Sequence, residues 1–189
     1  MMFNLPGLLG TLYAASEIGL SIFKRAKSGD TKNADRGSLI LLWIVIAVSI
    51  ALAFQTAFSL PAANLGALMV PALYAGIACY VGGLILRWYS IVILGKFFTV
   101  NVAIAADHRL IDTGPYRYLR HPSYTGALLA FLGLGLCMGN WASMLVMFVP
   151  ILVVFLRRMN VEEAALLKGL GEPYRDYMQR TKRLLPGLY

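Results

Sequence analysis

Charged side chains are scarce in this chain of 189 residues, and histidine and cysteine are nearly missing. Asp, Glu, Lys and Arg together make up 14% of the sequence, whereas hydrophobic residues make up 59%. A soluble domain carries about 25% charged residues, so this composition excludes an ordinary soluble protein. The two cysteines share no metal-ligand spacing with the two histidines. We therefore expect an integral membrane protein that binds no metal.

The surplus of cations does not predict a nucleic-acid partner. The formal net charge of +8 comes from 17 Lys and Arg against 9 Asp and Glu. These cations do not form one basic stripe but fall into three clusters between long apolar runs, a pattern typical of cytoplasmic loops and helix ends in membrane proteins. The clusters are Lys24, Arg25, Lys27, Lys32 and Arg36; Arg87, Lys96, Arg109, Arg117 and Arg120; and Arg157, Arg158, Lys168, Arg175, Arg180, Lys182 and Arg183.

Three apolar runs in the first half of the chain are long enough to cross a membrane. Residues 1–23 form the first run, which we interpret as a retained helix and not a signal peptide. The second run, residues 39–60, ends at Pro61, and the third follows a short uncharged turn and continues to Leu94. We expect three spanning helices, with residues 1–94 as an N-terminal transmembrane region.

The run from Ser123 to Leu156 is too long for one crossing. It holds 34 uncharged residues, which would make a helix of about 51 Å against a hydrocarbon core of about 30 Å. We predict that it folds back at Gly139-Asn140 into a hairpin of two helices of about sixteen residues. Beyond it, Gly169 and Gly171 end a helical segment, and Pro173 is well placed to open a short helix.

The complete prediction is an all-α integral membrane protein with five transmembrane segments, the last two forming the hairpin. The N-terminus lies outside, and the C-terminus and the functional site lie in the cytoplasm. Residues 95–189 form the second region, in which a cytoplasmic loop and the C-terminal helices build the site. The short chain suggests a prokaryotic cell membrane.

Glu17 and Arg87 are charged residues inside the apolar runs, and each can be interpreted in two ways. Glu17 is an acid in a spanning helix, which is a functional candidate, but it lies seven residues from the basic end of its run. We expect it to reach the membrane interface. Arg87 has aromatic neighbours, and we expect an interface anchor in preference to a residue that points inward to an anionic ligand.

The most polar stretch of the chain, residues 107–124, contains both histidines and two prolines. Apolar runs lie on both sides, so its donors need water or a ligand as partners. An ordinary interfacial loop that faces lipid phosphates is the simpler reading. Arg158 and Glu162, at the end of the hairpin, are four residues apart on one helix face and could simply pair with each other.

The motifs in this half of the chain resemble the isoprenylcysteine carboxyl methyltransferase family and, more distantly, the membrane phospholipid N-methyltransferases. The resemblance covers about residues 95–186. The motifs are His108-x-Leu110-Ile111-x-x-Gly114-x-Tyr116, Arg120-His121-Pro122-Ser123-Tyr124, Arg158-x-x-x-Glu162-Glu163, Gly171-x-x-Tyr174-x-x-Tyr177 and Arg183-Leu184-x-Pro186.

The resemblance implies a membrane methyltransferase that uses S-adenosylmethionine and methylates the carboxylate of a lipophilic acceptor, either isoprenylcysteine-like or an isoprenoid or fatty acid. It also implies Arg158 as the residue that holds the acceptor carboxylate. The implied cofactor-contacting residues are Asn101, His108, Arg109, Leu110, Ile111, Tyr116, His121, Pro122, Ser123, Tyr124 and Glu162.

Two other functions stay open at this point. An N-methyltransferase of amine lipids would need a base, for which His108, His121 and Glu163 are candidates. A non-catalytic scaffold or small transporter would need polar residues at mid-depth in the spans, where beyond Gln55 and Asn64 almost none occur.

Overall fold

The computed structural model describes residues 4–23, 36–98 and 109–187. Two of the predicted site residues, Asn101 and His108, lie outside the described residues. The elements are α1 (Asn4–Phe23), α2 (Arg36–Ser59), η1 (Pro61–Ala63), η2 (Gly66–Leu68), α3 (Met69–Leu94), η3 (Gly95–Phe97), η4 (Gly114–Arg117), α4 (Pro122–Cys137), α5 (Trp141–Leu170) and α6 (Glu172–Arg180). The predicted all-α class is confirmed.

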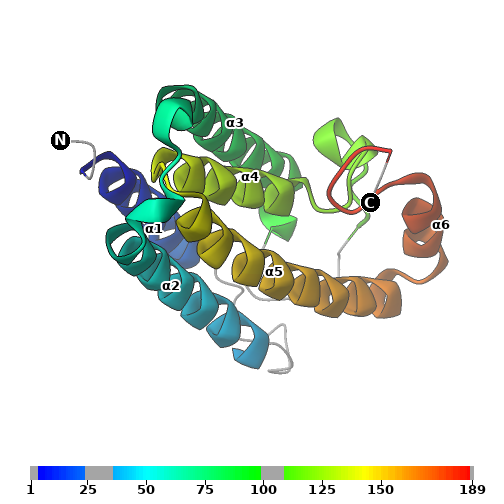
Figure 1. Ribbon diagram of the computed structural model, residues 1–189. Helices are drawn as coiled ribbons and strands as arrows, with labels where there is room; N and C mark the ends of the chain where they lie inside the picture. Colours follow the sequence, from blue (N-terminus) through cyan, green and yellow to red (C-terminus); the bar gives the residue numbers. More distant parts are fainter. Residues whose placement is uncertain (1–3, 24–35, 99–108, 188–189) are drawn as a thin grey trace.

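The long helices lie side by side. α5 packs between α2 and α4, and α4 packs between α5 and α3, while α1 lies against α4 (Figure 1). Within the described residues, three helical segments are long and apolar enough to cross a membrane: Gly37–Ser59, Gly66–Phe97 and Trp141–Leu170. α4 is apolar but shorter, with 16 residues. The chain is therefore an integral membrane protein, and its five-span count stays a prediction.

α4 and α5 are joined by a tight turn at the predicted position. Gly139 adopts a positive φ of 65°, and α5 begins at Trp141. The predicted length of the second helix was wrong, because α5 does not stop near Leu156 but continues to Leu170. No proline occurs between Arg157 and Gly171, and the single glycine there, Gly169, lies inside the helix instead of ending it as predicted. The helix therefore runs on into the polar segment and ends before Gly171.

The two uncharged turns lie together at one end of the bundle. The Asn140 side chain accepts from the Ser143 backbone N–H at 3.0 Å and so caps α5. Its amide nitrogen donates to the Leu60 carbonyl at 2.9 Å and to Asn64 Oδ1 at 3.1 Å. The turn after α2 and the turn before α5 are thus fixed to each other, as expected for two turns on the same side of a membrane.

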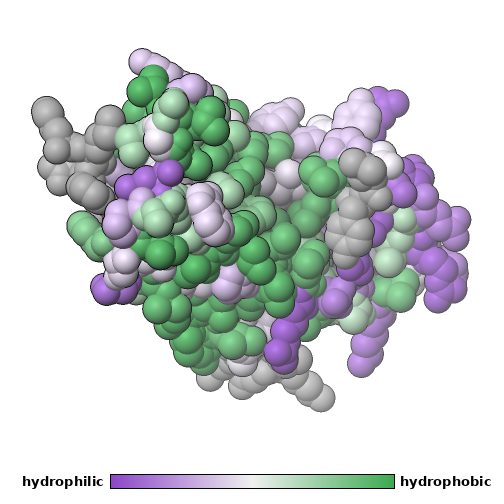
Figure 2. All heavy atoms as spheres, in the orientation of Figure 1, coloured by the Kyte–Doolittle hydropathy of each residue, from purple (hydrophilic) through white to green (hydrophobic). Residues whose placement is uncertain are grey.

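The outside of the bundle is apolar along the helices and polar at one end. Ile40, Ile44, Val48 and Leu52, four residues apart on α2, are all exposed. Figure 2 shows hydrophobic side chains over the central helices and hydrophilic ones gathered around α6. A soluble protein does not expose such a surface, and lipid is the solvent that it suits.

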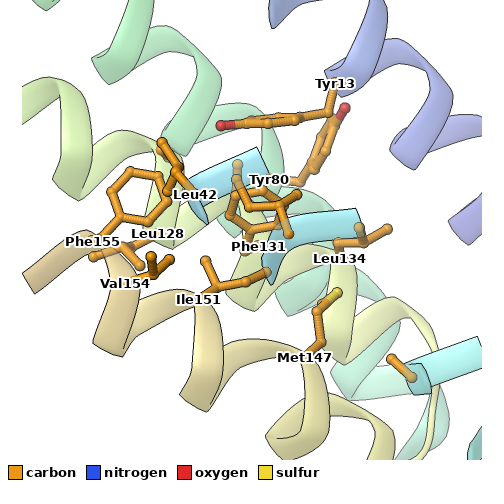
Figure 3. Close-up of a cluster of buried hydrophobic side chains, with 14 of the residues drawn as sticks. Tyr13, Leu42, Tyr80, Leu128, Phe131, Leu134, Met147, Ile151, Val154 and Phe155 are labelled. Atoms are coloured by element: carbon orange, nitrogen blue, oxygen red, sulfur yellow. The ribbon is translucent and has the colours of Figure 1, made fainter. Parts of the chain in front are cut away.

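The helices pack around one core of aromatic and branched side chains. Tyr13 of α1, Leu42 of α2, Phe131 of α4 and Ile151 of α5 meet in the centre of the bundle (Figure 3). The rings of Tyr13 and Phe131 are 4.7 Å apart, and Tyr80 of α3 donates its hydroxyl to the Leu9 carbonyl of α1 at 2.7 Å. These contacts hold α1 against α3 and α4.

Glycines allow α3 and α4 to approach closely. A Cβ on Gly83 would lie 2.5 Å from the carbonyl oxygen of Gly126 and 2.6 Å from the backbone nitrogen of Ala130. Two helical turns earlier in α3, Gly76 faces Gly133 in the same way. The two backbones therefore touch without side chains between them, the kind of contact that small residues make in membranes.

We expect Gly83→Ala to lower the stability of the folded protein by roughly 1–3 kcal/mol, because the methyl group forces the two helices apart. The measurement is thermal unfolding in detergent. The neighbouring Gly82→Ala is the matched control, since nothing lies within 4 Å of a Cβ at that position. Equal melting temperatures for the two variants would contradict the close packing of α3 on α4.

Candidate functional site

The segment before α4 is held by the C-terminal end of the described chain. The Arg120 backbone N–H donates to the Lys182 carbonyl at 2.7 Å, and the His121 N–H donates to the Arg183 carbonyl at 3.1 Å. The Lys182 N–H in turn donates to the Tyr118 carbonyl at 3.2 Å. Two segments about 60 residues apart in sequence therefore pair in parallel and fix the entry into α4.

Glu163 is the centre of a buried ion cluster. Its carboxylate accepts from Arg120 Nε at 2.8 Å, faces His121 Nε2 at 3.0 Å and pairs with Arg183 Nη2, with only 4% of its surface exposed. Arg120 also donates to the Met178 carbonyl at 3.0 Å. The cluster joins α5, α6, the loop and the C-terminal segment at one point.

Glu162, the next residue, has a different neighbourhood. It is half-buried, and its Oε2 accepts from the Tyr124 hydroxyl at 2.7 Å. The ring of Tyr124 stacks on His121 with a centroid separation of 5.4 Å and an interplanar angle of 17°. A partly accessible carboxylate beside flat aromatic surfaces suits a ligand with a cationic group and a planar ring.

α6 covers this region with two buried tyrosines. The Tyr177 hydroxyl lies 2.6 Å from the Tyr116 carbonyl oxygen and 3.1 Å from that of Leu119. Burial raises the pKa of both the Tyr177 and Tyr116 phenols above the ordinary value, and the Glu162 carboxylate raises that of Tyr116 further. Both phenols therefore stay neutral at physiological pH and act as hydrogen-bond donors.

A cavity of about 50 Å³ adjoins this site inside the helix bundle. Its apolar walls are formed by Leu39, Leu42, Trp43, Ile46, Phe98 and Phe155. Its polar lining comes from Glu17, Arg87, Tyr124 and Arg158. Arg158 is 3% exposed, and its Nη1 donates to the Ser38 hydroxyl at 3.2 Å. Because Tyr124 lines the cavity and also binds Glu162, the two sites share a wall.

Glu17 and Arg87 do not extend from the surface of the bundle as interface anchors would, but are buried and paired with each other. Each is 7% exposed, and they form a two-point ion pair, with Arg87 Nε 2.6 Å from Glu17 Oε1 and Nη2 2.7 Å from Oε2. Arg87 Nη1 donates to the Ser123 hydroxyl at 3.0 Å. The pairing of opposite charges is what allows both side chains to be buried.

The structure brings together most of the predicted site residues that it describes. Tyr116, His121, Pro122, Ser123, Tyr124, Arg158 and Glu162 all lie around the shared wall or next to residues that form it. Arg109 is exposed, and Leu110 and Ile111 are half-buried in the strip that leads to η4. The adjacent Asp112 pairs with Arg180 of α6 at 3.2 Å. No cluster of metal ligands occurs among the described residues.

Sequence reasoning missed the supporting residues. Arg120, Glu163 and Arg183 form the ion cluster, and the Tyr177 hydroxyl binds the loop backbone. Arg120, Arg183 and Tyr177 had been given no role, and Glu163 had been considered only as a candidate base. The sequence did contain a signal for these four residues, since all of them belong to the motifs on which the family resemblance rests. The Glu17–Arg87 pair had no such signal, because 70 residues separate its partners.

We expect Glu163→Ala to destabilise the protein by about 3–5 kcal/mol, because it leaves buried cations without their counter-charge. Thermal unfolding measures the effect, and hydrogen exchange of residues 181–187 locates it. Glu172→Ala is the control, since Glu172 pairs with Arg175 on the surface with most of both side chains exposed, where such pairs contribute little. An unchanged exchange rate in the C-terminal segment of Glu163→Ala would contradict the assigned role.

Two curated proteins with similar sequences are named as isoprenylcysteine O-methyltransferases. The "Protein-S-isoprenylcysteine O-methyltransferase" of Schizosaccharomyces pombe is 34% identical over 106 residues, which cover 55% of this chain and 45% of that protein. The "Protein-S-isoprenylcysteine O-methyltransferase B" of Arabidopsis thaliana is 32% identical over 113 residues, covering 59% and 57%. The chain thus spans about half the length of the curated relatives that it matches.

A solved structure shares the fold. The eukaryotic intramembrane Ras methyltransferase, an isoprenylcysteine carboxyl methyltransferase, superposes with a TM-score of 0.64 at 28% identity, over 77% of this chain and 52% of that one. These matches confirm the resemblance seen in the motifs. Residues 71–172 match the family described as "Phospholipid methyltransferase". Because this match covers more than half of the 189 residues, the chain belongs to the phospholipid methyltransferase family.

Proposed function

We propose that this chain transfers the methyl group of S-adenosylmethionine to the carboxylate of a lipophilic acceptor. The observation that carries the proposal is the position of Arg158, which is buried at an apolar cavity and lies one helical turn from the carboxylate of Glu162. An arginine fits an anionic acceptor, and an acid fits a cationic methyl donor. The names of the relatives, isoprenylcysteine O-methyltransferases, support the same class of reaction.

The residues around Glu162 fit the proposed cofactor. S-adenosylmethionine carries a sulfonium and an ammonium group, which the half-buried Glu162 would attract strongly at the edge of a low-dielectric region. Its adenine needs a flat surface, which the stacked His121 and Tyr124 rings offer. We include Tyr116, Pro122 and Ser123 in this site, together with Asn101 and the strip from His108 to Ile111.

The reaction needs placement more than acid–base chemistry. Bound S-adenosylmethionine supplies a methyl group on positively charged sulfur and departs as S-adenosylhomocysteine. The acceptor carboxylate is already ionised at neutral pH, so no side chain has to remove a proton. Arg158 would hold one carboxylate oxygen while the other forms the new bond to the methyl carbon, giving a methyl ester. The planar guanidinium fixes this geometry in a way that a lysine cannot.

The cavity favours an acceptor with a hydrocarbon chain. Its apolar walls come mainly from α2. A carboxylate at Arg158 would leave the rest of the acceptor between hydrophobic side chains. This arrangement suits an isoprenylcysteine-like molecule or an isoprenoid or fatty acid, and it explains why the enzyme is embedded in the membrane.

We also propose the five-segment topology, with the site in the cytoplasm. The two outer turns, which contain Asn64 and Asn140, are bound to each other. Hydrophilic residues gather at the other end, around α6 (Figure 2), and the sequence of α6 and the end of α5 includes the cations Lys168, Arg175 and Arg180. The positive-inside rule therefore supports a cytoplasmic site. We also keep residues 1–94 and 95–189 as the proposed transmembrane and methyltransferase regions, which are in contact through α3 and α4.

Two variants test the proposal by separating acceptor and cofactor binding. We expect Arg158→Ala to lower methyl transfer by roughly 100-fold or more, since it removes a buried charge partner of the acceptor. S-adenosylhomocysteine affinity, measured by calorimetry in detergent, should stay near the wild-type value. We expect Glu162→Ala to lose that affinity. Loss of S-adenosylhomocysteine binding in Arg158→Ala, with Glu162→Ala unaffected, would reverse the two assigned roles and contradict the proposal.

Methylation of an amine lipid is the second candidate, because the family is described by phospholipid methylation. An amine needs a base to take its proton. The Glu163 carboxylate already accepts from two arginines and faces His121, so the described part of the site favours a carboxylate acceptor. A non-catalytic scaffold would not explain a buried arginine beside Glu162.

The pH dependence of the rate distinguishes the two acceptors. For a carboxylate, we expect kcat/KM to be flat from about pH 6 to 8, since the acceptor is ionised throughout this range. An amine acceptor instead gives a rate that rises with pH as the ammonium group loses its proton. The measurement uses labelled cofactor with a prenylcysteine analogue and, separately, with phosphatidylethanolamine. A steep rise with the prenylcysteine analogue would contradict the proposed mechanism.

A further inference from the structure

The first turn of α4 carries the aromatic wall of the proposed cofactor site. Tyr124, the third residue of α4, donates its hydroxyl to Glu162 Oε2 at 2.7 Å and also lines the cavity. Capping side chains commonly fix the beginning of a helix. His121, the residue before α4, makes no capping bond with its side chain, and its Nε2 instead lies 3.0 Å from the Glu163 carboxylate. Other contacts therefore have to hold this turn in the orientation that Tyr124 needs.

Arg87 of α3 holds this turn through Ser123, the residue before Tyr124. Its Nη1 donates to the Ser123 hydroxyl at 3.0 Å and to the Ser123 carbonyl oxygen at 3.3 Å, and both residues are buried. The contact between Gly83 and Gly126 also brings α3 against α4, but only hydrogen bonds are directional enough to fix the rotation of α4 about its axis. Successive helical residues lie about 100° apart around that axis. The bonds from Arg87 therefore also determine where Tyr124 points.

Glu17 of α1 determines the orientation of the Arg87 guanidinium. Both oxygens of its carboxylate bind the guanidinium, through Nε at 2.6 Å and through Nη2 at 2.7 Å. This two-point pairing fixes the plane of the guanidinium and leaves Nη1 directed at Ser123. The opposite charge of Glu17 also allows the arginine to stay buried in the bundle. One guanidinium group thus connects α1 to the beginning of α4.

We propose that Glu17 and Arg87 are positioning residues, which hold the first turn of α4 in the orientation that the cofactor site needs. Tyr124 thereby stays beside Glu162. This inference rests on the proposed function, because it takes Glu162 as the group that binds the cofactor. Arg87 lies within residues 71–172, the region that matches the family, whereas Glu17 lies before that region. The first helix therefore contributes to the site by orienting an arginine that the matched region contains.

Two variants separate a positioning role from a merely structural one. Glu17→Gln removes the counter-charge of Arg87, so we expect it to lower the melting temperature and to weaken S-adenosylhomocysteine binding on the order of tenfold. The double variant, Glu17→Gln with Arg87→Met, contains neither charge, so its melting temperature should return toward the wild-type value. Its affinity should stay as low as that of Glu17→Gln, because no guanidinium reaches Ser123. Thermal unfolding and calorimetry in detergent measure the two quantities.

Tyr80→Phe is the matched control. It removes the hydrogen bond from the Tyr80 hydroxyl to the Leu9 carbonyl, which also joins α3 to α1 but does not involve Arg87. We expect this variant to bind S-adenosylhomocysteine as the wild type does. An equal loss of affinity in Tyr80→Phe and Glu17→Gln would mean that the ion pair only holds α1 in place. That result would overturn the inference, as would a double variant that regains affinity together with stability.

Hydrogen exchange separates this inference from the proposed function, since it needs no ligand. We expect the amides of residues 123–126 to exchange faster in Glu17→Gln and in the double variant than in the wild type and Tyr80→Phe, because the first turn of α4 is no longer held. If these rates change but the wild type binds no S-adenosylhomocysteine, the proposed function fails and the positioning role stands. If the rates of these residues are the same in all of these proteins, the inference is overturned.

Discussion

The arrangement of the polar segments in this structure depends on the direct pairing of buried charges. The bundle is largely apolar and offers no water to a charge inside it, so each buried carboxylate must meet its cations directly. Glu163 does so at the polar end, where Arg120 and Arg183 reach it from two other segments. The loop, α6 and the C-terminal segment add buried side chains of their own, among them Tyr116, Tyr177 and Leu184. The positions of these segments also depend on this cluster and on the backbone pairing beside it.

The close approach of α3 and α4 places the second charged pair. Gly83 and Gly126 let the two backbones touch, and four residues beyond Gly83 the Arg87 side chain reaches Ser123 at the beginning of α4. A larger residue at either glycine would increase the distance across which Arg87 has to reach. Helix packing and the electrostatics of the cavity are therefore not independent, because the same contact determines both.

The sequence was sufficient for the features that depend on local chemistry. The turn at Gly139, the helix end before Gly171 and the short helix α6 follow from glycine, proline and capping residues close to them. The motifs also gathered Tyr124 and Glu162 into one site. What could not be predicted depends on pairing across long separations. Glu17 and Arg87 each looked like a residue near the interface, since a single charge in an apolar run gives no sign of its partner.

The neighbouring acids Glu162 and Glu163 show how one helix can serve structure and chemistry together. Successive residues on an α-helix point about 100° apart. Glu163 therefore faces the arginines and is buried, while Glu162 turns toward Tyr124 and stays partly accessible. The cluster at Glu163 holds His121, on which the Tyr124 ring stacks. Glu163 thus fixes the aromatic surface that lies beside Glu162, the acid that we propose to bind the cofactor.

The residues that line the cavity come partly from the region that matches the family and partly from the helices before that region. Arg87, Tyr124 and Arg158 lie within residues 71–172, the region that matches the family. Glu17 of α1 and Trp43 of α2 lie before that region, as do the other apolar residues that α2 contributes. Methyl transfer needs a fixed geometry, whereas the hydrocarbon part of an acceptor needs only a matching apolar wall. For the reaction that we propose, the part of the chain that matches the family therefore contributes the charged groups, whereas α1 and α2 contribute much of the wall that an acceptor would contact.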